Sequence, residues 1–86
     1  MARFEYTVTH ELGLHARPAG MLAKLAGGYK SAITISKAGG AGVDLKRINA
    51  VMRLCIKKGD LVHFAAEGDD EDSAIAALEA LCRKSL

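Results

Sequence analysis

The sequence predicts an α+β domain, a two-layer open-faced β-sandwich in which a four-stranded antiparallel sheet carries three helices on one face. The first observation is a set of short segments in which apolar and polar residues alternate, as strands with one buried face do. The second is three segments with apolar residues at helical spacing, which can cover the apolar face of that sheet. The predicted order is β-α-β-β-α-β-α, and 86 residues leave room for one core, so residues 1–86 should form a single domain.

The first strand is expected at residues 3–9, followed by a turn that ends at Gly13. The only proline of the chain, Pro18, favours the first turn of a helix, where its missing N–H costs nothing. This helix should begin near Ala16 and end at about Gly27, because glycines often terminate helices. The alternating apolar residues of the strand are Phe4, Tyr6 and Val8, and the apolar positions of the helix are Pro18, Leu22, Leu25, Ala26 and Tyr29.

The middle of the chain predicts two more strands and a second helix. Ile33 and Ile35 alternate with polar residues in the second strand, and the glycine-rich stretch 37–42 indicates a hairpin into a short third strand. Asp44 can then cap the second helix, since a side-chain oxygen at that position can accept from a free N–H. The apolar residues of this helix are Leu45, Ile48, Val51, Met52 and Cys55.

A turn at residues 57–60 leads to the fourth strand and the last helix. Asp69 is expected to cap that helix, with acidic side chains in its first turn and Arg83 and Lys84 in its last, as the helix dipole favours. The buried face of the strand should carry Val62, Phe64 and Ala66, and the buried stripe of the helix Ala74, Ile75, Leu78, Leu81 and Cys82.

Composition excludes several classes of protein. A net charge of +2 and the lack of a basic run with interleaved aromatics argue against nucleic-acid binding. The sequence contains no apolar run of 18 residues, so no membrane span is expected. The N-terminus lacks the pattern of a signal peptide, so a cytosolic protein is expected. Cys55 and Cys82 fall on predicted helices without metal-ligand spacing and are expected to be buried, reduced thiols. We therefore expect neither a metal nor a cofactor.

The segment Gly13-Leu14-His15-Ala16-Arg17-Pro18-Ala19 carries the chemistry. It places His15 just before the first helical turn, where backbone N–H groups point outward and the helix dipole favours an anion. Arg17 adds a permanent positive charge. A neutral imidazole is a good nucleophile near pH 7, so the pattern predicts a phosphoryl group carried on His15 and held by Ala16 and Arg17. The other histidines, His10 and His63, have no such neighbours and are interpreted as structural.

This segment resembles the active-site segment of the histidine-containing phosphocarrier protein (HPr) family of the bacterial phosphoenolpyruvate-dependent sugar phosphotransferase system. Residues 31–35, 57–60 and 66–71 resemble the family as well. The resemblance implies strand order 1-4-2-3, a monomer, and no enzyme activity beyond stoichiometric phosphoryl transfer. It further implies that enzyme I phosphorylates the Nδ1 of His15, and that the phosphoryl group passes to a histidine on an enzyme IIA domain.

Both partners are expected to dock around the first two helices. Ile48 and Met52 form an i, i+4 pair that should point outward beside the site, and Gly20 and Met21 should continue this apolar patch.

The sequence departs from part of the family in one respect. Many HPr proteins of Gram-positive bacteria carry a regulatory serine at the start of the second helix, but residues 44–49 contain neither serine nor threonine. No kinase-controlled site is therefore expected. Two other functions stay open: an HPr-like carrier of a nitrogen-related or dihydroxyacetone-kinase phosphorelay, and a stand-alone catalyst such as a histidine phosphatase.

Overall fold

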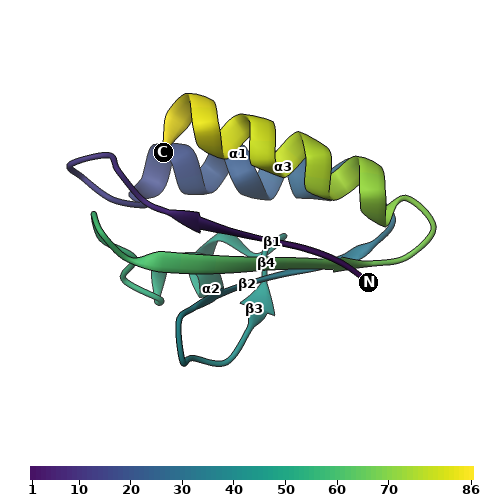
Figure 1. The fold of residues 1–86 in the computed structure, drawn as a ribbon, viewed down its shortest axis with the longest axis horizontal. Coiled ribbons are helices and arrows are strands. Elements are labelled where there is room, and N and C mark those ends of the chain that lie inside the picture. Colours follow the sequence, from purple (N-terminus) through teal and green to yellow (C-terminus); the bar gives the residue numbers. More distant parts are fainter.

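The fold is a four-stranded sheet with its two long helices packed above one face (Figure 1). The computed structural model describes residues 1–86. Helices α1 and α3 run side by side over the sheet, and the short α2 contacts α1 and the edge strand β3. The elements are β1 (Ala2–Thr7), α1 (Ala16–Gly27), β2 (Ala32–Lys37), β3 (Val43–Asp44), α2 (Ile48–Met52), β4 (Leu61–Glu67) and α3 (Glu71–Ser85).

The sheet order β1-β4-β2-β3 confirms the predicted topology. Every neighbouring pair is antiparallel, so β1 and β2 run parallel to one another on either side of β4. The alternation along β4 is complete, with buried side chains at Val62, Phe64 and Ala66 and partly exposed ones between them. One face of the sheet therefore packs on the helices and the other faces solvent, as expected for an antiparallel sheet in two layers.

The core lies between this sheet and the helices. Phe64 is its largest fully buried side chain, and the ring of Phe4 on the neighbouring strand stacks on it with centroids 4.7 Å apart. Leu22 from α1 and Leu78 from α3 are fully buried in the same cluster. Val51 of α2 also belongs to it, so all three helices share one core. Leu81, predicted to be buried, is only partly so and, like Leu25, packs at the margin of the core.

The first strand is shifted from its predicted position. It was expected at residues 3–9, but strand pairing ends at Thr7. Val8 continues the alternation of the strand, and its side chain points inward and is buried. Its N–H donates to the carbonyl of Asp60. The N–H of Thr9 instead donates to the carbonyl of Leu86 at 2.8 Å, so the chain leaves the sheet to meet the end of α3.

The second helix is shorter than predicted, and Asp44 does not cap it. Asp44 ends β3, and its carboxylate accepts from the N–H of Lys46 at 2.9 Å, which makes a local turn. The helix starts only at Ile48, after Arg47 at the N-cap position. It ends before Cys55, which has a positive φ of 52° and is exposed, so the expectation of a buried helical thiol is wrong there. Cys82 is buried as expected, and burial raises the pKa of its thiol to about 12.

Asp70, rather than Asp69, occupies the N-cap position of α3. Its carboxylate does not cap the helix but reaches across to the loop before β2, where it accepts from the N–H groups of Lys30 at 2.8 Å and Ser31 at 2.9 Å. The hydroxyl of Ser31 donates to the same carboxylate. These bonds lower the pKa of Asp70, with the Ser31 hydroxyl as the largest cause. Asp70 therefore ties the α1–β2 loop to the β4–α3 turn.

Candidate functional site

His15 occupies the N-cap position of α1, with extended backbone angles and no capping hydrogen bond from its side chain. Its carbonyl already accepts from the N–H of Ala19 at 3.0 Å, so the helix begins directly behind the imidazole. Pro18 has no N–H, and the N–H groups of Ala16 and Arg17 have no acceptor within the protein. Two free donors and the positive end of the helix dipole thus lie beside a free imidazole ring.

The turn that presents His15 is held against the segment after α2. Gly13 has φ +64°, and a Cβ built there would lie 2.5 Å from the carbonyl oxygen of Ile56 and 2.7 Å from Cα of Lys57. The next N–H, that of Leu14, donates to the same Ile56 oxygen at 3.0 Å, and the Leu14 side chain is buried. Gly13 is therefore required both for its backbone conformation and for the close approach of two chain segments.

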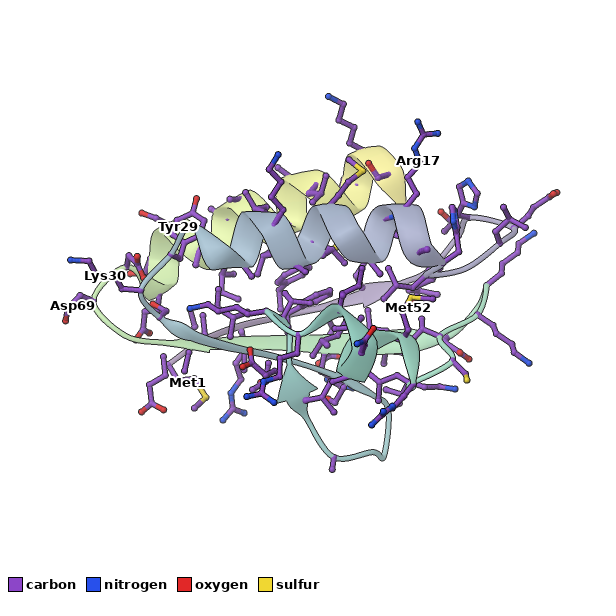
Figure 2. The ribbon with its side chains drawn as sticks, turned by 180° about the vertical axis from the view of Figure 1, so that it is seen from behind. Met1, Arg17, Tyr29, Lys30, Met52 and Asp69 are labelled. Atoms are coloured by element: carbon purple, nitrogen blue, oxygen red, sulfur yellow. The ribbon has the colours of Figure 1, made fainter.

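Two cationic side chains without ion-pair partners line the same depression as the imidazole. Arg17 on α1 and Lys84 on α3 form no ion pair, and Arg17 extends away from α1 into solvent (Figure 2). Both line a shallow depression that we call the site hollow, with a volume of about 450 Å³. It is lined by His10, Leu12, His15, Arg17, Pro18, Met21, Lys84 and Ser85. The hollow is open and cationic, which suits a small anion that must enter and leave.

His10, interpreted from the sequence as structural, lies next to His15 and lines the same hollow. Its ring centroid lies 5.5 Å from that of His15, with the rings tilted by 45°. The turn between them, closed by a bond from the N–H of Gly13 to the carbonyl of His10, brings the two side chains together. In the sequence, Gly13 was the only indication of this proximity. A glycine favours a chain reversal, and a reversal at Gly13 can bring His10 and His15 to the same side of the turn.

The four expected docking residues lie on exposed parts of α1 and α2. Ile48 and Met52 are 38% and 36% exposed, and Met21 is 42% exposed, so none of them is a core residue. A Cβ at Gly20 would lie 3.6 Å from the end of Ile48, which joins α1 and α2 on this flank. Met21 lies instead on the α3 flank, where it lines the site hollow. Met52 and Arg17 lie toward the same end of the molecule (Figure 2).

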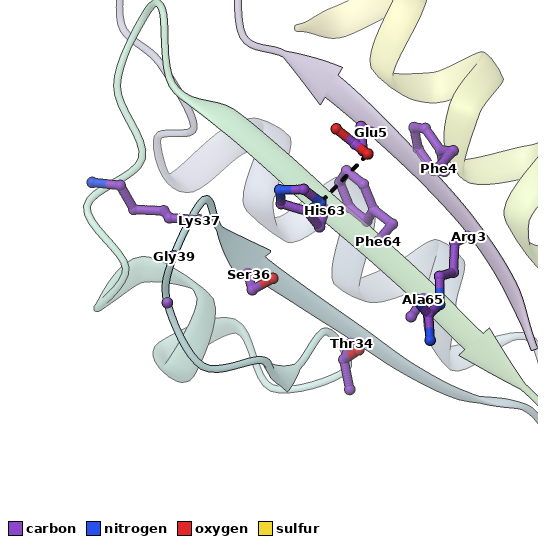
Figure 3. A pocket seen from close by; sticks show the side chains of 11 residues that line it. Arg3, Phe4, Glu5, Thr34, Ser36, Lys37, Gly39, His63, Phe64 and Ala65 are labelled. Carbon is purple, nitrogen blue, oxygen red and sulfur yellow. Dashed lines mark ion pairs between the residues drawn. The ribbon is translucent and has the colours of Figure 1, made fainter.

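A second depression lies on the open face of the sheet, away from the helices (Figure 3). His63 faces Glu5 across the β1–β4 pair, with 3.9 Å between the ring Nδ1 and the carboxylate. The depression holds no group of three or more metal-ligating side chains, and neither does the rest of the chain. None of the helices combines the length and hydropathy that crossing a membrane requires.

Comparisons with known proteins agree with this geometry. The family model for the PTS HPr component phosphorylation site matches residues 2–84. The phosphocarrier protein HPr of Mycoplasma capricolum is 44% identical over 79 residues, covering 92% of this chain and 88% of the relative. A solved structure of a histidine-containing phosphocarrier protein of mycoplasma has a TM-score of 0.93 at 39% identity, covering 98% and 94% of the two chains. An HPr dimer from Thermoanaerobacter tengcongensis has a TM-score of 0.76 at 38% identity, covering 92% and 94%.

Proposed function

Because this chain belongs to the HPr family of phosphocarrier proteins of the phosphotransferase system, we propose that His15 accepts a phosphoryl group from phosphorylated enzyme I and passes it to enzyme IIA domains. The observation that carries the proposal is the placement of His15 at the start of α1, beside two free N–H groups and unpaired cations. Such a placement can hold a phosphoryl group and leaves it accessible to a second protein.

The chemistry needs only positioning and charge. The lone pair of a ring nitrogen of His15, Nδ1 in this proposal, attacks the phosphorus of a phosphohistidine on enzyme I. The new N–P bond forms as the old one breaks, and the donor imidazole takes back the electron pair as the leaving group. The N–H groups of Ala16 and Arg17 and the Arg17 guanidinium hold the transferred oxygens, each contact contributing about 1–3 kcal/mol.

The site binds the phosphoryl group only moderately, which suits a carrier. Solvent reaches the hollow, and water weakens each charge interaction there compared with a buried pocket. Transfer onward therefore needs no large energy input, and the chain acts as a stoichiometric carrier rather than an enzyme.

Docking of both partners uses the exposed apolar residues of α1 and α2. Met21, Ile48 and Met52 are exposed, and Gly20 lies against Ile48, so this surface is free to pack against another protein. We propose that the carrier works as a monomer in the cytoplasm, since docking requires this surface to be uncovered.

The test is incubation with enzyme I and phosphoenolpyruvate, followed by intact mass. Wild type should gain one phosphoryl group, which acid removes and base does not, as expected of a phosphoimidazole. His15→Ala should fold with an unchanged melting temperature and gain none, because the His15 side chain makes no hydrogen bond within the protein. An acid-stable product, or full phosphorylation of His15→Ala, contradicts the proposal.

A further inference from the structure

The ring of His10 stands next to the ring that is proposed to carry the phosphoryl group. The centroids are 5.5 Å apart, and both rings line the site hollow with Arg17 and Lys84. A phosphoryl group on His15 extends that side chain by one P–N bond and one P–O bond. Its oxygens therefore reach into the space that His10 borders.

The tautomer of His10 is fixed by its own turn. The N–H of Leu12 lies 3.2 Å from the Nδ1 of His10, and a backbone N–H can only donate. Nδ1 must therefore hold a lone pair, which leaves the proton of the neutral ring on Nε2. This Nε2–H has no acceptor within the protein. The turn thus offers a neutral, oriented donor at the edge of the hollow.

We propose that His10 is a phosphoryl-binding residue, whose Nε2–H donates a hydrogen bond to a phosphoryl oxygen on His15. This inference rests on the proposed function and names one more residue of that site. The other charged groups around His10 are Arg17 from α1, Lys84 from α3 and Glu11 in the same turn. A bond to an anionic oxygen is shorter and stronger than one between neutral groups, so His10 holds the phosphorylated form more tightly than the free form.

The first experiment measures this difference at equilibrium. Equal amounts of wild type and His10→Ala share a limiting supply of phosphoryl groups through a catalytic amount of enzyme I, and intact mass reports the phosphorylated fraction of each. At equilibrium, the distribution of phosphoryl groups between the two proteins does not depend on how fast either protein binds enzyme I. The ratio of phosphorylated to free protein should be about threefold to tenfold lower for His10→Ala than for wild type.

Two variants serve as controls. His10→Asn keeps an oxygen that can accept from the N–H of Leu12 and adds amide donors, so it should recover most of the loss. His63→Ala removes a histidine from the open sheet face and should share the phosphoryl groups equally with wild type. Equal sharing between His10→Ala and wild type overturns the proposal.

A second measurement separates binding from a role in the turn, and it does not need enzyme I. Phosphoramidate phosphorylates histidine directly, because the ring nitrogen displaces ammonia from phosphorus. In protein loaded this way, the NMR signal of the His10 Nε2–H should shift and exchange more slowly with water. An unmoved signal overturns the proposal even if His10→Ala loses phosphoryl groups. A failure of enzyme I to phosphorylate wild type would count against the proposed function alone.

Discussion

The carbonyl oxygen of Ile56 lies 2.5 Å from the position that a Cβ at Gly13 would occupy, and the N–H of Leu14 donates to this same oxygen. The turn before His15 is thus fixed by direct backbone contact with a segment more than forty residues further along the chain. A side chain at Gly13 would push the two segments apart.

Gly13→Ala should therefore destabilise the protein and weaken phosphoryl transfer. The positive φ alone costs about 1–2 kcal/mol for a residue with a Cβ, and the clash with Ile56 adds to it. Gly39→Ala is the matched control, because Gly39 also has a positive φ but nothing lies within 4 Å of its Cβ position. In denaturant unfolding, the loss in free energy of unfolding for Gly13→Ala should be at least twice the loss for Gly39→Ala. Equal losses would mean that the close approach of Gly13 to Ile56 does not contribute to stability.

Met52→Glu should slow phosphorylation by enzyme I about tenfold or more while the melting temperature stays nearly unchanged. The change places an acid in the proposed docking surface, beside the site that is proposed to carry a phosphoryl group. Rapid-quench assays with enzyme I measure the rate of phosphorylation. Ala76→Glu, on the exposed side of α3, is the control for the added negative charge. An unaffected rate would show that Met52 is outside the interface.

HPr kinase with ATP should add no phosphate to residues 44–49. Arg47 occupies the N-cap of α2, where a serine would be favoured and where a regulatory serine would be expected, and its side chain makes no capping bond. Arg47→Ser supplies a hydroxyl at this position and should also stabilise the protein by about 0.5–1 kcal/mol. Peptide mapping by mass spectrometry checks both proteins. A phosphate within this stretch of wild type would refute the prediction.

Asp70→Asn should lower the melting temperature at neutral pH, and its difference from wild type should shrink in acid. The bonds from Ser31 and Lys30 hold the pKa of Asp70 below its ordinary value of 3.8. The ionised carboxylate therefore contributes stability above that value, and the contribution is lost as pH falls through the lower pKa of the folded state. Thermal melts between pH 7 and pH 2 measure the difference. Asp69→Asn is the control, since Asp69 makes no such bond. A difference between Asp70→Asn and wild type that did not shrink as the pH fell below 3.8 would contradict this account.

Periodicity in the sequence predicted the elements whose faces are clearly apolar on one side. Alternating apolar and polar residues favour a strand with one buried face, as found in β1 and β4. Proline favours the first turn of a helix, as found in α1. These predictions of strand and helix were confirmed. The strand order came only from the resemblance to the family.

Two of the errors fall where several polar residues could take the same role. Asp44 forms a local turn with Lys46, and Asp70 binds a loop forty residues away, and neither choice is visible in the sequence around it. The approach of His10 to His15 was also not predicted. It depends on the direction in which the Gly13 turn reverses, which only the folded chain determines.

The bonds from Thr9 and His10 to the carbonyl of Leu86 join the turn before His15 to the C-terminal end of α3. Contacts between such distant positions form late in folding, because the chain between them must first be ordered. A nascent chain whose α3 is still inside the ribosome lacks the carbonyl that these two N–H groups use. The turn that presents His15 is therefore complete only after α3 has emerged and packed on the sheet.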